Sequence, residues 1–200
     1  RQTLSLPEGA PVLVVGSTRT PDEEQLVVDA YMRVRATLPD TCLVLAPRHL
    51  ERVGEVERLL QARGLTPHRR SQLPLSDGAH AQVVIVDTFG ELASLYSVAD
   101  VVVVGGAFAP LGGQNLFQPL AHGKPVFFGA HTHNFRDIAQ LAKAAGVGFE
   151  VQTAEQLAEG VLRLLHDPKL REQIAQQASE LIQKHQGAAQ RCAEMVKKWL

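Results

Sequence analysis

The stretch VLVVGSTRTPDEE, residues 12–24, joins two different local patterns, and the fold can be inferred from this junction. Its four apolar residues, 12–15, are typical of a strand that is buried on both faces. The proline at position 21 and the acids at 22–24 predict the first turn of a helix after a short loop. A buried strand that leads directly into a helix is the repeating unit of sheets with parallel strands.

The same alternation continues along the chain. Further strands are predicted at 43–46, 67–71 (an edge strand), 83–86, 101–104, 125–128 and 146–151. Helices are predicted between 20 and 38 and at 50–62, 90–97, 115–122, 134–145, 154–165 and 168–200, and 71–80 is predicted to be a surface loop. Right-handed crossovers place such helices on both faces of the sheet. We therefore expect an α/β fold, a doubly wound parallel sheet, with residues 1–200 as a single domain that has a long C-terminal helix.

The composition excludes several classes of protein. With 45% hydrophobic and 20% charged residues, the chain has the composition of a globular protein, not of a disordered or fibrous one. A net charge of −1 argues against a nucleic acid partner. Cys42 and Cys192 are far apart and lack ligand spacing, which argues against a disulfide framework and a cysteine zinc site. The chain has no signal peptide and no apolar run of about 18 residues, the length of a membrane span. Because it begins at Arg1, we expect a soluble piece of a longer protein.

Ligands of doubly wound sheets bind at the carboxyl ends of the strands, where loops lead into helices. In this sequence those loops, 16–20, 47–49, 87–91 and 105–115, are rich in glycine and polar residues. The three-glycine dinucleotide fingerprint is absent, since the first loop has only one glycine. We expect these loops to form the site, with further lining by Ser17, Thr18, Arg19, Gly105, Gly106, Gly112 and Gly113.

Two features of these loops have two interpretations each. Arg48 is placed to bind a phosphate with two nitrogen atoms, or it pairs with Glu51 or Glu55 on its own helix. The glycine pairs 105–106 and 112–113 let a ligand approach the backbone closely, or they are turns that the chain path alone requires.

The segment 87–91 predicts a helix cap, with Asp87 or Thr88 as the capping residue and Glu91 three residues after Thr88. Such a cap leaves the N–H groups of Phe89 and Gly90 free to meet a ligand.

His131 and His133 have a spacing at which both could bind one metal ion. No third ligand is placed by spacing, so we prefer a loop in which Asn134 caps the following helix, and we expect no metal site. No nucleophile elbow is present to support a Ser-His-Asp triad.

Several short motifs occur together in one order. They are Gly16-Ser17-Thr18, Pro47-Arg48-His49, Asp87 to Leu92, Tyr96 with Ala99-Asp100, Gly105-Gly106, Gly112 to Asn115 followed by Pro119, Gly123 to Val126, Gly129 with His131, and Asn134-Phe135. In this order they resemble the motifs of the 3-deoxy-D-manno-octulosonic acid (Kdo) transferases, over roughly residues 11–165.

The resemblance implies the Rossmann-like, C-terminal donor-binding half of a GT-B glycosyltransferase without metal or other cofactor. Members of that family transfer Kdo from CMP-Kdo to lipid A precursor at the cytoplasmic face of the bacterial inner membrane, with peripheral or anchored membrane association. The resemblance places CMP contacts on Pro47, Arg48, Phe89, Gly90, Glu91, Asn115, Leu116, Phe117 and Gln118. It implies that Arg48 and a helix start at Asn115 hold the phosphate, that 89–91 approach the nucleoside, and that position 118 meets the ribose.

The chain departs from the family pattern at three positions. Gln118 stands where the family usually has Glu, Leu116 where a residue like Pro is usual, and Arg19 where His is common. The family's proposed catalytic base, a Glu, lies in an N-terminal acceptor domain that is absent here, so we expect donor binding without turnover. Two alternatives stay open: a degenerate, non-catalytic nucleotide-binding module of the same fold, or a GT-B enzyme that uses a UDP-sugar.

The last part of the predicted C-terminal helix also has two interpretations. Gly187 offers a bend, and Lys197, Lys198 and Trp199 then pack against the missing half or touch anionic lipid.

Overall fold

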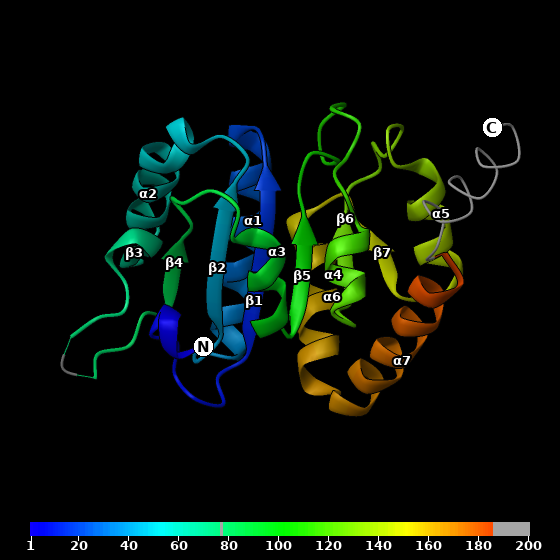
Figure 1. Ribbon diagram of the computed structural model, residues 1–200. Helices are drawn as coiled ribbons and strands as arrows, with labels where there is room; N and C mark the ends of the chain where they lie inside the picture. The colour runs from blue at the N-terminus through cyan, green and yellow to red at the C-terminus, as the bar shows by residue number, and fades with distance from the viewer. Residues whose placement is uncertain (77, 186–200) are drawn as a thin grey trace, which may run out of the picture.

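The computed structural model describes residues 1–76 and 78–185, and its centre is a seven-stranded sheet in which every neighbouring pair is parallel. The strand order is β3-β4-β2-β1-β5-β6-β7 (Figure 1). The strands are β1 (Val12–Thr18), β2 (Cys42–Pro47), β3 (Pro67–Arg69), β4 (Val83–Ile85), β5 (Val101–Val104), β6 (Val126–Phe128) and β7 (Gly148–Glu150). All residues of β2 and β5 are buried, as their uninterrupted apolar runs predict for central parallel strands.

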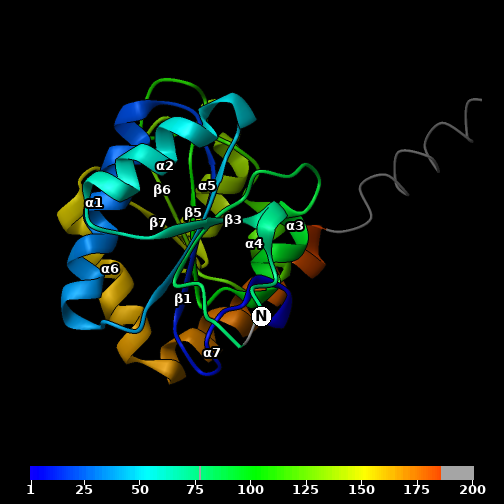
Figure 2. The ribbon, with the colours of Figure 1, turned by 90° about the vertical axis from the view of Figure 1, so that its left-hand side faces the viewer.

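Seven α-helices among the described residues cover the sheet. They are α1 (Pro21–Thr37), α2 (Val53–Ala62), α3 (Leu92–Leu95), α4 (Phe117–Ala121), α5 (Arg136–Ala144), α6 (Ala154–His166) and α7 (Pro168–His185). Figure 2 shows α1, α2 and α6 on one face of the sheet and α3, α4 and α7 on the other. The predicted doubly wound parallel sheet is therefore confirmed.

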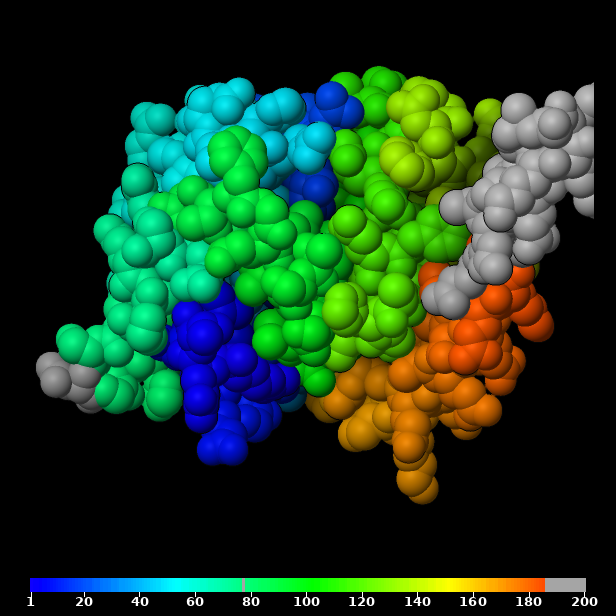
Figure 3. Space-filling model, in the orientation of Figure 1, coloured from blue at the N-terminus to red at the C-terminus, as the bar shows by residue number. Residues whose placement is uncertain are grey.

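The strand order changes direction between β1 and β5, which are hydrogen-bonded neighbours in the sheet. The strands that come between them in sequence, β2, β3 and β4, all lie on the other side of β1. Such a switch point leaves a crevice at the carboxyl ends of the two strands, because the chain leaves them toward opposite faces. In Figure 3 the loops that follow β2 (cyan), β1 (blue) and β5 (green) stand side by side along the upper rim.

Local signals predict the start of the first helix correctly. The hydroxyl of Thr20 accepts a hydrogen bond from the Glu23 N–H (3.3 Å), and Pro21 occupies the first helical position. Four other helices begin two or three residues later than predicted: α2 at 53, α3 at 92, α4 at 117 and α5 at 136. Short 3-10 turns occupy Leu50–Arg52, before α2, and Tyr96–Val98, after α3. The helix predicted from 168 is described to His185, so the predictions for Gly187, Cys192 and 197–199 lie outside the described residues.

None of the helices in the described part of the chain is long and apolar enough to cross a lipid bilayer.

Candidate functional site

The carboxyl end of β1 has an unusual backbone conformation. Ser17 adopts φ +62°, a left-handed conformation that only glycine adopts without strain, and the pairing with β2 shifts register between Gly16 and Thr18. A Cβ on Gly16 would overlap the Tyr96 hydroxyl, so only glycine fits there. Burial raises the pKa of the Tyr96 hydroxyl above its usual value. Strained backbone of this kind often occurs at ligand sites.

Glu23, in the first turn of α1, connects the loops of β1 and β5 across the switch point. Its side chain is buried, and its two carboxylate oxygens accept three backbone N–H groups. Oε1 accepts from Gly106 (2.7 Å) and Phe108 (3.1 Å), and Oε2 accepts from Arg19 (2.8 Å). The sequence places Glu23 only in a helical first turn, and the one signal of a larger role is its position directly after the loop at the switch point.

The four glycines of the predicted lining are buried, and the chain path accounts for each of them. A Cβ on Gly105 would lie 2.7 Å from the Ser17 carbonyl oxygen, and a Cβ on Gly112 would overlap the Asn134 side-chain amide. Gly106, Gly112 and Gly113 all have positive φ. The N–H of Gly105 donates to the Gly16 oxygen, and the N–H of Gly113 donates to the Gly106 oxygen. The interpretation as turns therefore explains these glycines, and the N–H groups of 105, 106 and 113 already have protein acceptors.

The arginines around this edge of the sheet fall into two groups. Arg52, Arg69 and Arg70 are paired with the carboxylates of Glu24 (2.5 Å), Glu57 (2.6 Å) and Glu91 (3.1 Å), respectively. The guanidinium groups of Arg19 and Arg48, by contrast, pair with no carboxylate among the described residues, and the same holds for Arg136 at the start of α5.

Arg48 follows the buried Pro47 at the end of β2, and its side chain is exposed. Of its two proposed local partners, Glu55 pairs with Arg52 (3.0 Å), and Glu51 lies 3.8 Å from His49. The alternative interpretation, in which Arg48 pairs with Glu51 or Glu55, is therefore not found. The side chain is left facing solvent at the carboxyl edge.

Beneath these loops, Thr18 is fully buried and donates to the Glu24 carboxylate (3.4 Å). Because Glu24 is itself buried and held by Arg52, Thr18 supports the site from below.

The predicted helix cap at 87–91 is wrong. α3 begins only at Leu92, and no side chain caps its first turn. Asp87 instead accepts hydrogen bonds from the N–H (2.8 Å) and the hydroxyl (2.6 Å) of Ser71, in the segment after β3. Thr88 donates to the Glu91 carboxylate (2.8 Å), which also binds Arg70. These contacts attach the 87–91 loop to the segment after β3.

The tip of that loop is open to solvent. The Phe89 side chain is 82% exposed, and Gly90 has φ +83°, with open space where a Cβ would stand. Neither N–H group donates to an acceptor in the described part of the chain, as the sequence predicts. An aromatic ring this exposed has little role in folding and is available to a ligand.

The segment 115–118 supplies both buried and exposed groups. Asn115 accepts the N–H of Phe117 through its side-chain oxygen (2.8 Å), so this oxygen is already used. Leu116 is 2% exposed, and only its backbone can meet a ligand. Phe117 is 39% exposed, and Gln118 is exposed and makes no side-chain hydrogen bond to the described residues.

The prediction that Asn134 caps the next helix is wrong. α5 begins at Arg136, after Phe135, and has no side-chain cap. Asn134 and His133 lie against Gly112, and the Asn134 N–H donates to the Gly112 oxygen (3.0 Å). The loop 131–134 thus packs on the glycine-rich loop. Within the described residues, no three His, Cys, Asp or Glu side chains are grouped to hold a metal ion.

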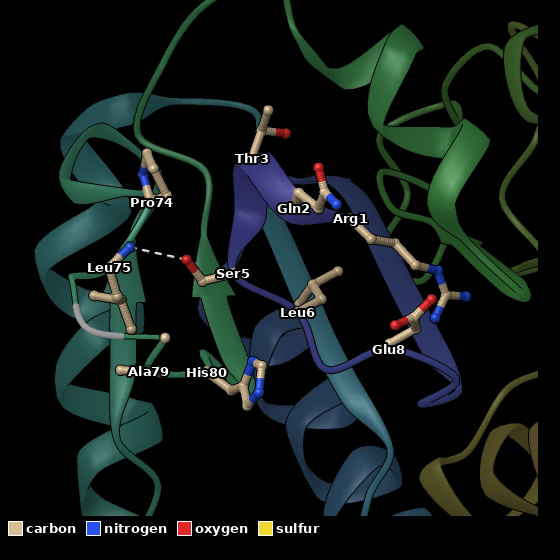
Figure 4. Close-up of a pocket in the computed structure, with 11 residues that line it drawn as sticks. Arg1, Gln2, Thr3, Ser5, Leu6, Glu8, Pro74, Leu75, Ala79 and His80 are labelled. Atoms are coloured by element: carbon tan, nitrogen blue, oxygen red, sulfur yellow. Dashed lines mark hydrogen bonds between the residues drawn. The ribbon is translucent and has the colours of Figure 1, made fainter.

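A hollow of about 670 Å³ lies away from these loops. Residues 1–3, 5, 6 and 8 line one side, and Pro74, Leu75 and residues 78–80 line the other, where the Leu75 N–H donates to the Ser5 hydroxyl (2.8 Å; Figure 4). None of the residues predicted for the donor site lines it.

The comparisons with known proteins agree with this architecture. The profile of the family described as "Glycosyl transferases group 1" matches residues 12–181. The 3-deoxy-D-manno-octulosonic acid transferase of Bordetella pertussis is 38% identical over 96% of this chain and 45% of its own length, so the chain spans about half of that relative. The Haemophilus influenzae enzyme of the same name is 33% identical over 95% of this chain and 44% of its length.

Among solved structures, the C-terminal CMP-Kdo binding domain of WaaA from Acinetobacter baumannii is similar with a TM-score of 0.80 and 30% identity. The match covers 88% of this chain and 91% of that domain. WaaG, a glycosyltransferase of lipopolysaccharide biosynthesis, shares the fold at 18% identity with a TM-score of 0.64. The chain therefore belongs to the group 1 glycosyl transferases and, among them, to the 3-deoxy-D-manno-octulosonic acid transferases.

Proposed function

We propose that this chain binds CMP-Kdo as the donor half of an enzyme that transfers Kdo to lipid A precursor, at the cytoplasmic face of the bacterial inner membrane. The observation that carries the proposal is the similarity to a CMP-Kdo binding domain over 91% of that domain's length. The acceptor site and the catalytic base would then belong to a part of the enzyme that this chain does not include.

The geometry of the carboxyl edge supports a nucleoside monophosphate as ligand. Arg48 presents a guanidinium that no described carboxylate neutralises, and a guanidinium binds phosphate oxygens in pairs. In this proposal the exposed ring of Phe89 and the adjacent backbone meet the cytosine, and Gln118 meets the ribose hydroxyls.

Titration of the chain with CMP and with UMP, followed by calorimetry or NMR, tests the proposal. We expect CMP to bind more tightly than UMP and Arg48→Ala to weaken CMP about 10- to 100-fold, the equivalent of a charge-assisted hydrogen bond of about 1.5–3 kcal/mol. Arg58→Ala is the matched control, because Arg58 is an exposed arginine on α2 whose side chain hydrogen-bonds, within the described residues, only to the Gly54 oxygen. Equal losses in the two variants, or no CMP binding at millimolar concentration, would contradict the proposal.

A substitution at Gln118 distinguishes two forms of the proposal, an active donor site and a degenerate nucleotide-binding module. An amide offers one acceptor and one donor group where a carboxylate offers two acceptors, so Gln118→Glu should strengthen CMP binding if the ribose lies there. Unchanged affinity in Gln118→Glu would remove this residue from the proposed site.

A further inference from the structure

Arg19 has a position at the switch point that the phosphate-binding proposal does not use. It follows the strained end of β1, and its backbone N–H is held by the Glu23 carboxylate (2.8 Å). Its side chain extends over the glycine-rich loop of β5, since its Cδ would lie 3.3 Å from a Cβ on Gly106. The guanidinium thus lies beside the glycine-rich loop that follows β5.

This guanidinium is poorly satisfied by the protein. Its one hydrogen bond in the described part of the chain joins Nη1 to the Leu111 carbonyl oxygen at 3.4 Å, which is long for such a bond. No described carboxylate pairs with it, although Arg52, Arg69 and Arg70 along the same edge are all paired. Most of its N–H groups are therefore available to an anion.

Arg19 and Arg48, whose guanidinium groups pair with no described carboxylate, directly follow the neighbouring strands β1 and β2. The Arg48 N–H donates to the carbonyl oxygen of Thr18 (2.8 Å), the residue directly before Arg19. The proposed donor carries two anionic groups: the single phosphate of CMP and the carboxylate of the octulosonic acid. Two guanidiniums at one crevice match that pair of charges.

We propose that Arg19 binds the carboxylate of the donor sugar and thereby selects an acidic sugar over a neutral one; this inference rests on the proposed function. A planar guanidinium matches a carboxylate with two parallel hydrogen bonds. The backbone N–H groups of Gly106 and Phe108 cannot take this role, because they already donate to the Glu23 carboxylate.

The test compares CMP with CMP-Kdo on the wild-type chain and on Arg19→Ala, Arg19→Lys and Arg163→Ala. Arg163 is the matched control, an exposed arginine on α6 with no carboxylate partner among the described residues. We expect Arg19→Ala to lower the affinity for CMP-Kdo about 10- to 100-fold and to leave that for CMP within about 2-fold. Arg19→Lys keeps the positive charge but loses the planar pair of N–H donors, so its affinity for CMP-Kdo should lie between those of the wild type and Arg19→Ala. Arg163→Ala should bind both ligands as tightly as the wild type.

The remaining outcomes separate the inference from the proposed function. Equal weakening of CMP and CMP-Kdo by Arg19→Ala would show that Arg19 binds the phosphate, and unchanged affinity for both would show that it binds neither group; both results overturn the inference. If the wild-type chain binds CMP, the proposed function stands whichever of these results is found. If it binds neither CMP nor CMP-Kdo, the proposed function and the inference fail together.

Discussion

Replacing Glu23 by Gln should loosen the switch point, because this one buried carboxylate connects both of its loops. The amide keeps one acceptor oxygen where the carboxylate has two. With that oxygen in the Oε1 position, Gly106 and Phe108 retain an acceptor, while the amide nitrogen faces the N–H of Arg19.

The size of the effect follows from these three contacts. One N–H loses its acceptor, which costs about 1–3 kcal/mol when the group is buried, and two hydrogen bonds lose their charge assistance. We expect the free energy of unfolding to fall by about 2–4 kcal/mol, a large share of the stability of a typical domain.

Urea unfolding followed by circular dichroism measures this loss. Asp22→Asn is the matched control, since Asp22 is an exposed acid in the same helical turn and should lose less than about 1 kcal/mol. Amide hydrogen exchange adds a local readout: the N–H groups of Arg19, Gly106 and Phe108 should exchange faster in Glu23→Gln than in Asp22→Asn. If the two variants lose equal stability and exchange alike at these amides, Glu23 does not connect the loops.

Two further predictions concern stability. Gly105→Ala should lower the free energy of unfolding by about 1–3 kcal/mol or more, because the new Cβ would lie 2.7 Å from the backbone at Ser17 and Thr18. Gly54→Ala should raise it by up to about 1 kcal/mol, because a Cβ there meets nothing within 4 Å and alanine favours the helix; equal stabilities of the two variants in urea unfolding would contradict this. Burial raises the pKa of the Cys42 thiol to about 11, so the folded state keeps a proton that the unfolded state loses above about pH 9, and stability present below that pH should fall by about 1 kcal/mol by pH 10. Cys42→Val should flatten this slope, and an unchanged slope would mean that other groups cause it.

The order of strands and helices could be predicted because it depends on long local patterns. The apolar runs at 12–15, 43–46 and 101–104 contain no polar residue, and such runs are stable only between two covering layers. The loops that line the crevice follow from the same argument, since the carboxyl ends of parallel strands share one edge.

The partners of short polar side chains could not be predicted in the same way. Asp87 and Asn134 each stand where a helix cap is expected, yet Asp87 binds Ser71 and Asn134 lies against Gly112. A cap residue can satisfy any nearby N–H group, and the choice depends on segments that are remote in sequence and close in space. Arg48 illustrates the same limit, because Arg52 rather than Arg48 takes the neighbouring Glu55.

The way in which Glu23 is used constrains how this crevice can recognise an anion. Glycine-rich loops often bind phosphate through backbone N–H groups, and the glycine pairs in this sequence suggest that role. In the folded chain the amides of Gly105, Gly106 and Gly113 have protein acceptors, and the acceptor for Gly106 is itself negatively charged. A carboxylate at this point repels an anion from the amides of Gly106 and Phe108, so these two groups do not attract the donor. Arg19 and Arg48, which follow β1 and β2, have guanidinium groups without a carboxylate partner among the described residues. Recognition of the donor by such side chains can be changed by single substitutions.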